Sequence, residues 1–451
     1  MAQSSWMLEH FGKFSNETAI VYDNRTFTYE QLLDAVERYS CKLRETDIKA
    51  GDVVAIHSDH SFDAIALFFA LAEHGNIVVP IVSEVADEVQ KRLETSAADW
   101  IFEKSDEGLV AKKCGNSVPK HRFIGVLKQR NHAGLILFSS GSTGEPKAML
   151  HDLDRLIEGY KEKNRKRLST LVFLTFDHIG GIDTMLRTFS IGGTLVVPAA
   201  REPESVCETI EKFRVNVLPV SPTFINLLLL SGLHTRYDLS SLEIIAFGAE
   251  PMPEPLLQRI KEGFANVRLQ QKFGTSETSA IRIKNADDDS LFFKIDDPNV
   301  EYRVVDAELW LKSGTQVLGY LNAPMESFTE EGWFKTGDLV EETKEGFIKI
   351  VGRNKEIINV GGEKVFPSEV EAVLHEMPEI ADVMVYAEEN GIMGQGVTAD
   401  IVPNGVYDKR EMKKLVRKFC KGRLDGYKIP SKINIVEKTN FTERFKKIRR
   451  K

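Results

Sequence analysis

Apolar and polar positions along the chain form a repeating order of helix-like and strand-like segments. Thr28 and Gln31 have the spacing of a capping box at the start of a helix. The side of that helix expected to be buried consists of Leu32, Leu33, Val36, Tyr39 and Leu43. Residues 52–56 and 76–82 then predict buried strands on either side of a helix at 62–74. This alternation is typical of parallel sheets covered by helices.

The same order continues through the middle of the chain. Residues 205–215 and 255–264 predict helices, and residues 216–221 and 242–248 predict strands. Residues 134–138 form a short apolar run that predicts another strand, and residues 149–160 are helix-like. A loop rich in serine and glycine separates these last two segments.

The pattern changes near residue 352, where a polar, glycine-containing stretch begins. A compact set follows it, with predicted helices at 368–376 and 409–421 and predicted strands at 381–387 and 433–436. We therefore expect an α/β protein with a large N-terminal domain of helix-covered β-sheets, residues 1–352. A small, mobile α+β domain is expected over residues 353–451.

Composition supports a globular protein with more than one core, since 42% of its 451 residues are hydrophobic and 28% are charged. The net charge of −8 argues against a surface devoted to nucleic acid or an anionic membrane. The four cysteines lack C-x-x-C spacing, which argues against a zinc site or a disulfide framework and favours a cytoplasmic location. The N-terminus predicts no export signal, and the apolar segment 62–82 is interrupted by polar residues, so no membrane span is expected.

Residues 139–149, SSGSTGEPKAM, have the composition of a loop that holds phosphate. Backbone N–H groups and hydroxyls of such a loop can surround phosphate oxygens, and Lys147 would add a mobile cation. The Walker sequence G-x-x-x-x-G-K-[ST] is absent. A solvent-exposed turn or linker is the alternative for this stretch taken alone.

Residues 138–149 resemble the phosphate-loop signature of the acyl-adenylate-forming superfamily, which includes acyl- and aryl-CoA synthetases, amino-acid adenylation domains and luciferases. Five further signatures follow in the family's order, at FGAEPMP (247–253), KFGTSET (272–278), GWFKTGDL (332–339), GRNKEIINVGGEKVFPSEVE (352–371) and YKIPSKINIVEKTNFTERFKKIRR (427–450). Together the signatures span most of the chain. The resemblance implies that a carboxylate attacks ATP to give an acyl-adenylate and pyrophosphate, and that a thiol then displaces AMP.

The resemblance also implies which residues bind the nucleotide. Glu277 would bind Mg²⁺ and Ser276 would donate to the α-phosphate. The β- and γ-phosphates would be held by Ser139, Ser140, Gly141, Ser142, Thr143, Gly144 and Lys147. The adenine slot would be formed by Phe273, Gly248, Ala249 and Glu250, with Gly274 and Thr275 beside it.

Asp338 would accept the ribose hydroxyls and Arg353 would support the same ribose. Each acidic residue also has a plain structural interpretation, Glu277 as a surface acid and Asp338 as a turn residue. Finding all the signatures in one order favours the nucleotide-binding interpretation.

The C-terminal signatures concern the second step and the movement between steps. Gly361 and Gly362 would line a pantetheine channel, with a plain β-turn as the alternative. Lys355 occupies the family's hinge position, although it could also be a solvated loop lysine. A gapless count from Val436 assigns the catalytic lysine to Lys446, and Lys447 is the rival. A solvated cationic tail is the alternative for this stretch.

Residues 174–182, LTFDHIGGI, occupy the family's acid-recognition segment. His178 matches the histidine of the acyl- and aryl-CoA synthetase pattern, and a core histidine is its structural alternative. A shift of one position would instead match Phe176 and Asp177 to the pair that holds the α-ammonium in amino-acid adenylation domains. The sequence HIGGI favours the first alignment.

We therefore expect an ATP- and Mg²⁺-dependent acid–thiol ligase. It would activate a fatty or aryl acid and pass the acyl group to CoA or to the pantetheine of an acyl carrier protein. An amino-acid adenylating enzyme and a nucleotide-binding regulatory protein without turnover are the alternatives. The altered terminal signature, which reads FKKIRR where Gly-Lys is usual, keeps the last alternative open, and Ala148 is a further departure from the family pattern.

Overall fold

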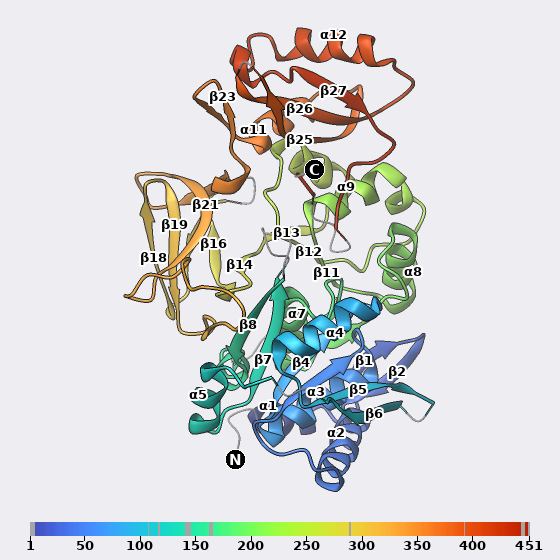
Figure 1. The fold of residues 1–451 in the computed structure, drawn as a ribbon. Helices are drawn as coiled ribbons and strands as arrows, with labels where there is room; N and C mark the ends of the chain where they lie inside the picture. Colours follow the sequence, from blue (N-terminus) through green and yellow to red (C-terminus); the bar gives the residue numbers. More distant parts are fainter. Residues whose placement is uncertain are drawn as a thin grey trace.

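The structure is a computed structural model that describes residues 5–106, 108–115, 118–139, 146–161, 166–287, 290–391, 393–442 and 447–449. It consists of a large N-terminal domain and a smaller C-terminal domain, which Figure 1 places at the bottom and top of the view. Among the described residues, no helix is both long and apolar enough to cross a bilayer.

Two seven-stranded sheets form the centre of the large domain (Figure 1). The first sheet has the order β13-β12-β11-β9-β10-β1-β2, with bounds Arg268–Gln271, Ile244–Phe247, Val217–Val220, Ser169–Leu171, Thr194–Val196, Thr18–Tyr22 and Arg25–Thr28. The second sheet has the order β20-β8-β7-β4-β3-β5-β6, with bounds Gly319–Tyr320, Lys147–Asp152, Gly134–Ser139, Ile77–Ile81, Val53–His57, Trp100–Ser105 and Gly108–Lys113. Strands β13 to β1 of the first sheet and β7 to β5 of the second pair in parallel, as the alternating pattern predicts.

One apolar core lies between the two sheets. Its helices are α1 (Ser5–Gly12), α2 (Tyr29–Glu45), α3 (Phe62–His74), α6 (Leu153–Glu158) and α7 (Ile179–Ser190). Residues 64–72 of α3 are all buried, because this helix is covered on every side. The outer face of the first sheet packs against α8 (Pro203–Phe213), α9 (Pro222–Ser231) and α10 (Glu254–Gly263). The outer face of the second sheet packs against α4 (Ala86–Ser96) and α5 (Arg122–Arg130).

Local signals predict several of these elements well and one of them wrongly. The capping box of Thr28 and Gln31 is present at the start of α2, and α3 has the predicted bounds. The helix predicted at 149–160 is wrong, because residues up to Asp152 form β8 in an antiparallel pair with β7. Helix α6 begins only after Asp152, whose side chain caps it. Strand β8 is buried on both faces, so its apolar run carries no period-two alternation to separate strand from helix.

A third, six-stranded antiparallel sheet follows in the chain. Its order is β16-β17-β22-β21-β19-β18, with bounds Ile283–Asn285, Phe293–Ile295, Ile348–Arg353, Phe334–Glu342, Glu308–Ser313 and Val300–Val305. The Arg303 guanidinium lies 4.8 Å from the ring centre of Trp310 and 4.3 Å from that of Trp333. The hairpin of β14 (Phe273–Thr275) and β15 (Ser279–Ile281) connects the first sheet to the third.

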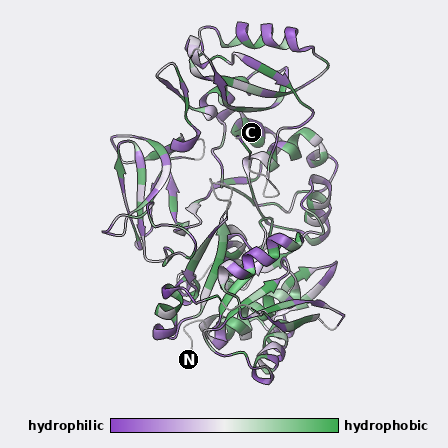
Figure 2. Cartoon of the chain, viewed as in Figure 1, coloured by the Kyte–Doolittle hydropathy of each residue, from purple (hydrophilic) through white to green (hydrophobic). Residues whose placement is uncertain are grey.

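The C-terminal domain has its own core, whose buried members fall between Ile358 and Ile433. Its sheet contains β24, β23, β26, β25 and β27, with bounds Glu363–Val365, Ile358–Val360, Gly394–Pro403, Ile380–Asn390 and Lys432–Ile435. Helices α11 (Pro367–Leu374) and α12 (Lys409–Cys420) pack on this sheet, near their predicted positions. The hydrophilic colour of α12 in Figure 2 marks its solvent side, while Met412, Val416 and Cys420 face the core.

Candidate active site

A cavity of about 940 Å³ lies at the carboxyl ends of strands in the first sheet. It is lined by Ser221, Gly248 and Lys272, which follow β11, β12 and β13. The start of α7, the β14–β15 hairpin, the third sheet and the domain junction at residues 353–355 complete its walls. Open α/β sheets bind ligands at this edge, so the fold itself places a site here.

Lys147, Tyr320 and Glu277 form a connected group at one end of the cavity. The Lys147 ammonium lies 4.8 Å from the ring centre of Tyr320. The Tyr320 hydroxyl donates a hydrogen bond of 2.9 Å to Glu277 Oε1. Burial, followed by the Glu277 charge, raises the pKa of Tyr320 well above its ordinary value, so the phenol remains a donor. A lysine and a carboxylate held by one ring can serve the phosphates of a nucleotide and a divalent cation.

Asn322 fixes the chain at the end of the phosphate loop. Its Oδ1 accepts from Ala148 N at 2.8 Å, and its Nδ2 donates to Pro146 O at 2.9 Å. Ser139, the last residue of β7, lines the cavity on the other side of the loop. The predicted phosphate ligands that lie outside the described residues are Ser140, Gly141, Ser142, Thr143 and Gly144.

The turn between β14 and β15 presents Ser276 and Glu277 to the cavity. Thr275 Oγ1 accepts from the amides of Glu277 at 3.2 Å and Thr278 at 3.1 Å, which fixes the turn. A Cβ atom at Gly274 would lie 2.4 Å from Ser279 O, so only glycine is accommodated there. One carboxylate at such a turn, together with nucleotide phosphates, suits the oxygen ligands that Mg²⁺ prefers.

The loop after β12 supplies Gly248 and Ala249 to the cavity wall, opposite Phe273. A Cβ atom at Gly248 would lie 2.8 Å from Lys272 O, and Ala249 adopts a φ of 71°. Glu250 is not among the residues that line the cavity. Its carboxylate accepts from Thr223 Oγ1 at 2.6 Å and from the Lys447 amide at 2.6 Å. The structure therefore separates Glu250 from the other residues predicted for the adenine slot.

Asp338 and Arg353 lie opposite each other on β21 and β22. Arg353 Nε donates to Asp338 Oδ1 at 3.0 Å, and the Asp338 side chain is buried. The Asp338 charge raises the pKa of Arg353, with Glu356 and Glu277 adding to the effect. Arg353, predicted beside the ribose, and Lys355, predicted at the hinge, line the cavity, whereas Asp338, the predicted ribose ligand, does not.

His178 lines the cavity at the start of α7. Its Nδ1 accepts a 3.0 Å hydrogen bond from the Gly180 amide and so caps the helix. Asp177, one residue earlier, accepts from Arg92 Nη1 at 2.9 Å and from Thr175 Oγ1 at 2.6 Å. Its carboxylate is buried in these contacts and is not part of the cavity wall, which leaves the alignment with amino-acid adenylation domains without support.

Beyond His178 the cavity continues between the first sheet and α7. The sheet side includes the apolar residues Val217, Pro219, Ile244 and Ala246, together with Arg268 and Gln270 of β13. The helix side carries Asp183, which accepts from Tyr160 at 2.7 Å and pairs with Arg187 at 3.2 Å. Burial alone would raise the pKa of Asp183, but Arg187 and the Tyr160 hydroxyl outweigh it and lower that pKa.

Two predicted C-terminal residues, Gly361 and Gly362, do not line the cavity. Gly361 and Gly362 form the turn between β23 and β24, with φ values of 60° and 98°. Two consecutive positive φ values are typical of a tight hairpin turn, and neither glycine lines the cavity. Lys446 lies outside the described residues, whereas Lys447 is buried in the C-terminal domain.

Sequence reasoning missed Tyr320, Asn322, Asp183 and Arg187. Tyr320 and Asn322 fall between the signatures, and only the pairing of β20 with β8 brings them to the phosphate loop. Asp183 and Arg187 are four residues apart on α7. This spacing predicts an ion pair on one side of the helix, but it does not predict that the pair lines a cavity.

The comparisons with known proteins identify an AMP-forming acid–thiol ligase. The model of the AMP-binding enzyme family matches residues 8–321, and that of the AMP-binding enzyme C-terminal domain matches residues 369–446. The chain therefore belongs to the AMP-binding enzyme family.

Similar proteins include 4-coumarate–CoA ligase-like 9 of Arabidopsis thaliana, 30% identical over 79% of this chain and 72% of that protein. The 2-succinylbenzoate–CoA ligase of Listeria monocytogenes is 25% identical over 96% of each chain. Among solved structures, the anthranilate CoA ligase AuaEII in complex with anthranoyl-AMP has a TM-score of 0.82 at 19% identity, covering 99% of this chain and 95% of the other. This last similarity concerns the fold.

Proposed function

We propose that this protein is an AMP-forming aryl-acid–CoA ligase. The proposal rests mainly on the Lys147, Tyr320 and Glu277 group, which lines a cavity that also contains the apolar residues Val217, Pro219 and Ile244. Its relatives include ligases for 2-succinylbenzoate and indoleacetate, both aromatic acids. A fatty acid remains the second candidate, since the sheet side of the cavity includes these apolar residues.

In the first half-reaction, Lys147 would bind the β- and γ-phosphates and Ser276 would donate to the α-phosphate. Glu277, oriented by Tyr320, would hold Mg²⁺, which neutralises phosphate charge when it is bound. His178 would lie beside the acid at the point where the two parts of the cavity meet. Donors fixed before the reaction stabilise the charge that develops on the α-phosphoryl oxygens.

The remaining roles belong to the movement between half-reactions. Lys446 would reach the α-phosphate during adenylation, with the domain boundary at residue 353 and the hinge at Lys355. The hairpin of Gly361 and Gly362 would approach the cavity after rotation, where glycines leave room for a pantetheine chain. CoA is the proposed acceptor, and a carrier-protein pantetheine is the alternative.

Aryl acids with a polar substituent are the substrate class that the cavity favours. The apolar residues Val217, Pro219 and Ile244 suit an aromatic ring, and the Asp183–Arg187 pair lines the same cavity from α7. A hydroxyl, amino or second carboxyl group on the ring could form hydrogen bonds with that pair. An unsubstituted long alkyl chain would leave these charges without a polar partner from the ligand.

Carboxylate-dependent exchange between ATP and pyrophosphate tests the proposal. A panel of substituted aryl, fatty and amino acids should show exchange with the aryl acids, and thioester formation on addition of CoA. Lys147→Ala should weaken exchange while leaving the free energy of unfolding within about 1 kcal/mol of the parent. Exchange with amino acids alone, or nucleotide binding without exchange for any acid, would contradict the proposal.

A further inference from the structure

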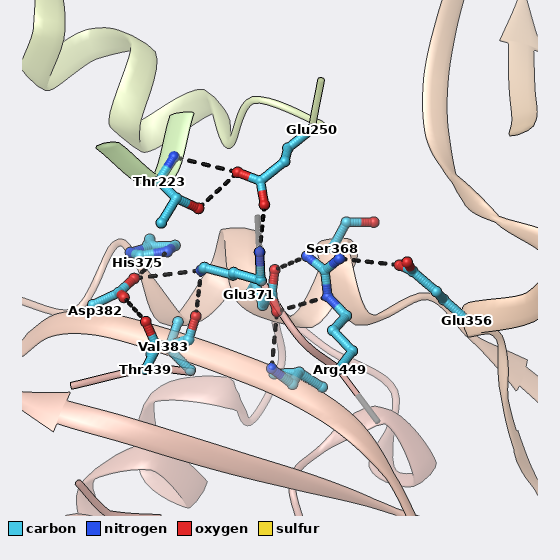
Figure 3. Close-up of polar contacts among 12 residues, drawn as sticks. Thr223, Glu250, Glu356, Ser368, Glu371, His375, Asp382, Val383, Thr439 and Arg449 are labelled. Carbon is cyan, nitrogen blue, oxygen red and sulfur yellow. Dashed lines mark hydrogen bonds and ion pairs between the residues drawn. The ribbon is translucent and has the colours of Figure 1, made fainter. Parts of the chain in front are cut away.

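The last described residues, 447–449, run between the two domains, and Figure 3 shows polar contacts of Glu250 and Arg449 in this region. The Lys447 amide donates a 2.6 Å hydrogen bond to Glu250 Oε1. Glu250 Oε2 accepts from the Thr223 amide and hydroxyl, which belong to the start of α9. One carboxylate of the large domain is thus bound to its own domain through one oxygen and to the C-terminal segment through the other.

The Lys447 side chain points into the C-terminal domain. Its ammonium donates to Val383 O at 2.6 Å and pairs with Asp382 at 3.4 Å, and only 8% of the side chain is exposed. Asp382 also accepts a 2.6 Å hydrogen bond from Thr439. Burial alone would lower the pKa of Lys447, but the charges of Asp382 and Glu371 outweigh it and raise that pKa. The ammonium is therefore charged and bound where it lies.

Arg449 adds a second buried anchor. Its guanidinium pairs with Glu371 at 2.9 Å and with Glu356 at 3.0 Å (Figure 3). Glu356 lies in the short helix at residues 354–356, beside the domain junction. The side chains of Lys447 and Arg449 thus bind within the C-terminal domain or at its junction. The hydrogen bond from the Lys447 amide to Glu250 connects the segment to the large domain.

These contacts respond differently to a rotation of the C-terminal domain. The bonds of Lys447 to Asp382 and Val383 join groups of one domain, so a rigid rotation preserves them. The bond to Glu250 joins two domains and must break. Glu250 directly follows Ala249, which lines the cavity, so the bond forms only when the C-terminal segment lies beside the nucleotide end of that cavity.

We propose that Lys447 is a positioning residue, and that its amide and Glu250 together form a domain-docking contact used in adenylation and broken before thioester formation. The Lys447 ammonium anchors the segment to β25, and it does not line the cavity. Reaching the α-phosphate would require it to leave two partners in a buried site, which is costly for a charged group. The inference rests on the proposed ligase function.

Glu250→Ala tests the docking contact without removing a buried cation. A hydrogen bond to a charged acceptor is worth roughly 10-fold in an equilibrium. We expect ATP–pyrophosphate exchange to slow about 10-fold, with an unchanged KM for ATP, and thioester formation from supplied acyl-adenylate to change less than about 2-fold. Glu254→Ala, an exposed carboxylate at the start of α10, is the matched control and should leave both rates unchanged.

Lys447→Met should also slow exchange selectively, and Lys432→Met, at an exposed lysine of the same domain, is its control. Equal slowing of both half-reactions by Glu250→Ala, or a raised KM for ATP alone, would overturn the inference. Loss of exchange in Lys447→Met with full exchange in Lys446→Ala would overturn it too, because Lys447 would then be the catalytic lysine.

A measurement independent of turnover separates this inference from the proposed function. In Glu250→Ala, peptides that contain the Lys447 amide should exchange hydrogen roughly 10-fold faster than in the parent protein. Unchanged exchange there would overturn the inference even if the enzyme is a ligase. Faster exchange in a protein that activates no acid would support the contact while the proposed function fails.

Discussion

The Tyr320 hydroxyl orients the carboxylate proposed to hold Mg²⁺. Tyr320→Phe removes the donor and keeps the ring beneath Lys147, so the Mg²⁺ concentration for half-maximal ATP–pyrophosphate exchange should rise by about 10-fold or more. A magnesium titration measures this. Tyr302→Phe, on the third sheet, is the control and should leave the titration unchanged. An unchanged magnesium titration in Tyr320→Phe would contradict the assignment of Glu277 as the Mg²⁺ ligand.

Asp177 is a structural carboxylate in this chain, because Arg92 and Thr175 occupy its oxygens. Asp177→Asn removes one charge of a buried pair and should lower the free energy of unfolding by roughly 2–3 kcal/mol. Chemical denaturation measures the change, and Asp87→Asn at an exposed site of α4 is the control. Activity toward aryl acids should persist in the folded variant. Selective loss of amino-acid activation would contradict this assignment.

Helix α6 contains a buried aspartic acid, Asp154, whose ionisation lowers the free energy of unfolding. Burial raises the pKa of Asp154 from 3.8 to about 6, and Ala133 N donates to its Oδ2 at 3.3 Å. Because the pKa of Asp154 is higher in the folded than in the unfolded protein, its protonated form favours the folded state. This contribution to stability is fully present below the unfolded-state pKa of 3.8 and is lost as pH rises through about 6.

Asp154→Asn imitates the protonated acid and should remove this loss. The variant should be more stable than the parent at pH 7, by about 3 kcal/mol, and the difference should vanish near pH 4. Urea denaturation across this pH range measures it. Glu158→Gln, at an exposed site of the same helix, should show no such trend. If the stability advantage of Asp154→Asn over the parent grew toward acid pH, the pKa of Asp154 would be lowered in the folded protein and the prediction would be wrong.

Elements with a clear local signal could be predicted from the sequence, and those defined by distant partners could not. Helix α3 ends at Gly75, which adopts a left-handed cap, so an apolar run and one glycine set its bounds. Strand β8 was mistaken for a helix because its partners β7 and β20 decide its state. Tyr320 joins the site through the same pairing, which no local pattern records.

The candidate site shows the same limit. The signatures group Lys147, Ser276 and Glu277 at one predicted site, and all three line the same cavity. Ser276 and Glu277 lie in the turn between β14 and β15, and Lys147 is the first residue of β8. The signatures placed Glu250 beside Ala249 in the adenine slot, whereas its side chain turns to Thr223 and to the C-terminal segment. The direction of a side chain depends on what the rest of the fold brings near, and one sequence does not contain that information.

For the whole molecule, the proposed role of the C-terminal domain in adenylation can be tested at Lys446. An interaction made only in the first transition state should affect only that half-reaction, and loss of one such charge costs about 10²–10³ in rate. Lys446→Ala should therefore slow acyl-adenylate formation and still convert supplied acyl-adenylate to thioester. Single-turnover assays of both steps measure this. Equal rates for variant and parent in the first step would show that Lys446 is not the catalytic lysine.

Trp310 and Trp333, which contact Arg303, both belong to the large domain, and this placement has a consequence for fluorescence. All four tryptophans of the chain precede residue 353, so the C-terminal domain contributes no indole emission. Tryptophan fluorescence will therefore report the large domain, from Trp6 in α1 and Trp100 in β5 to Trp310 and Trp333 near the third sheet, and not the C-terminal domain. Tyr407→Trp would place a single emitter in that domain, and its movement could then be followed against a background fixed by the rest of the chain.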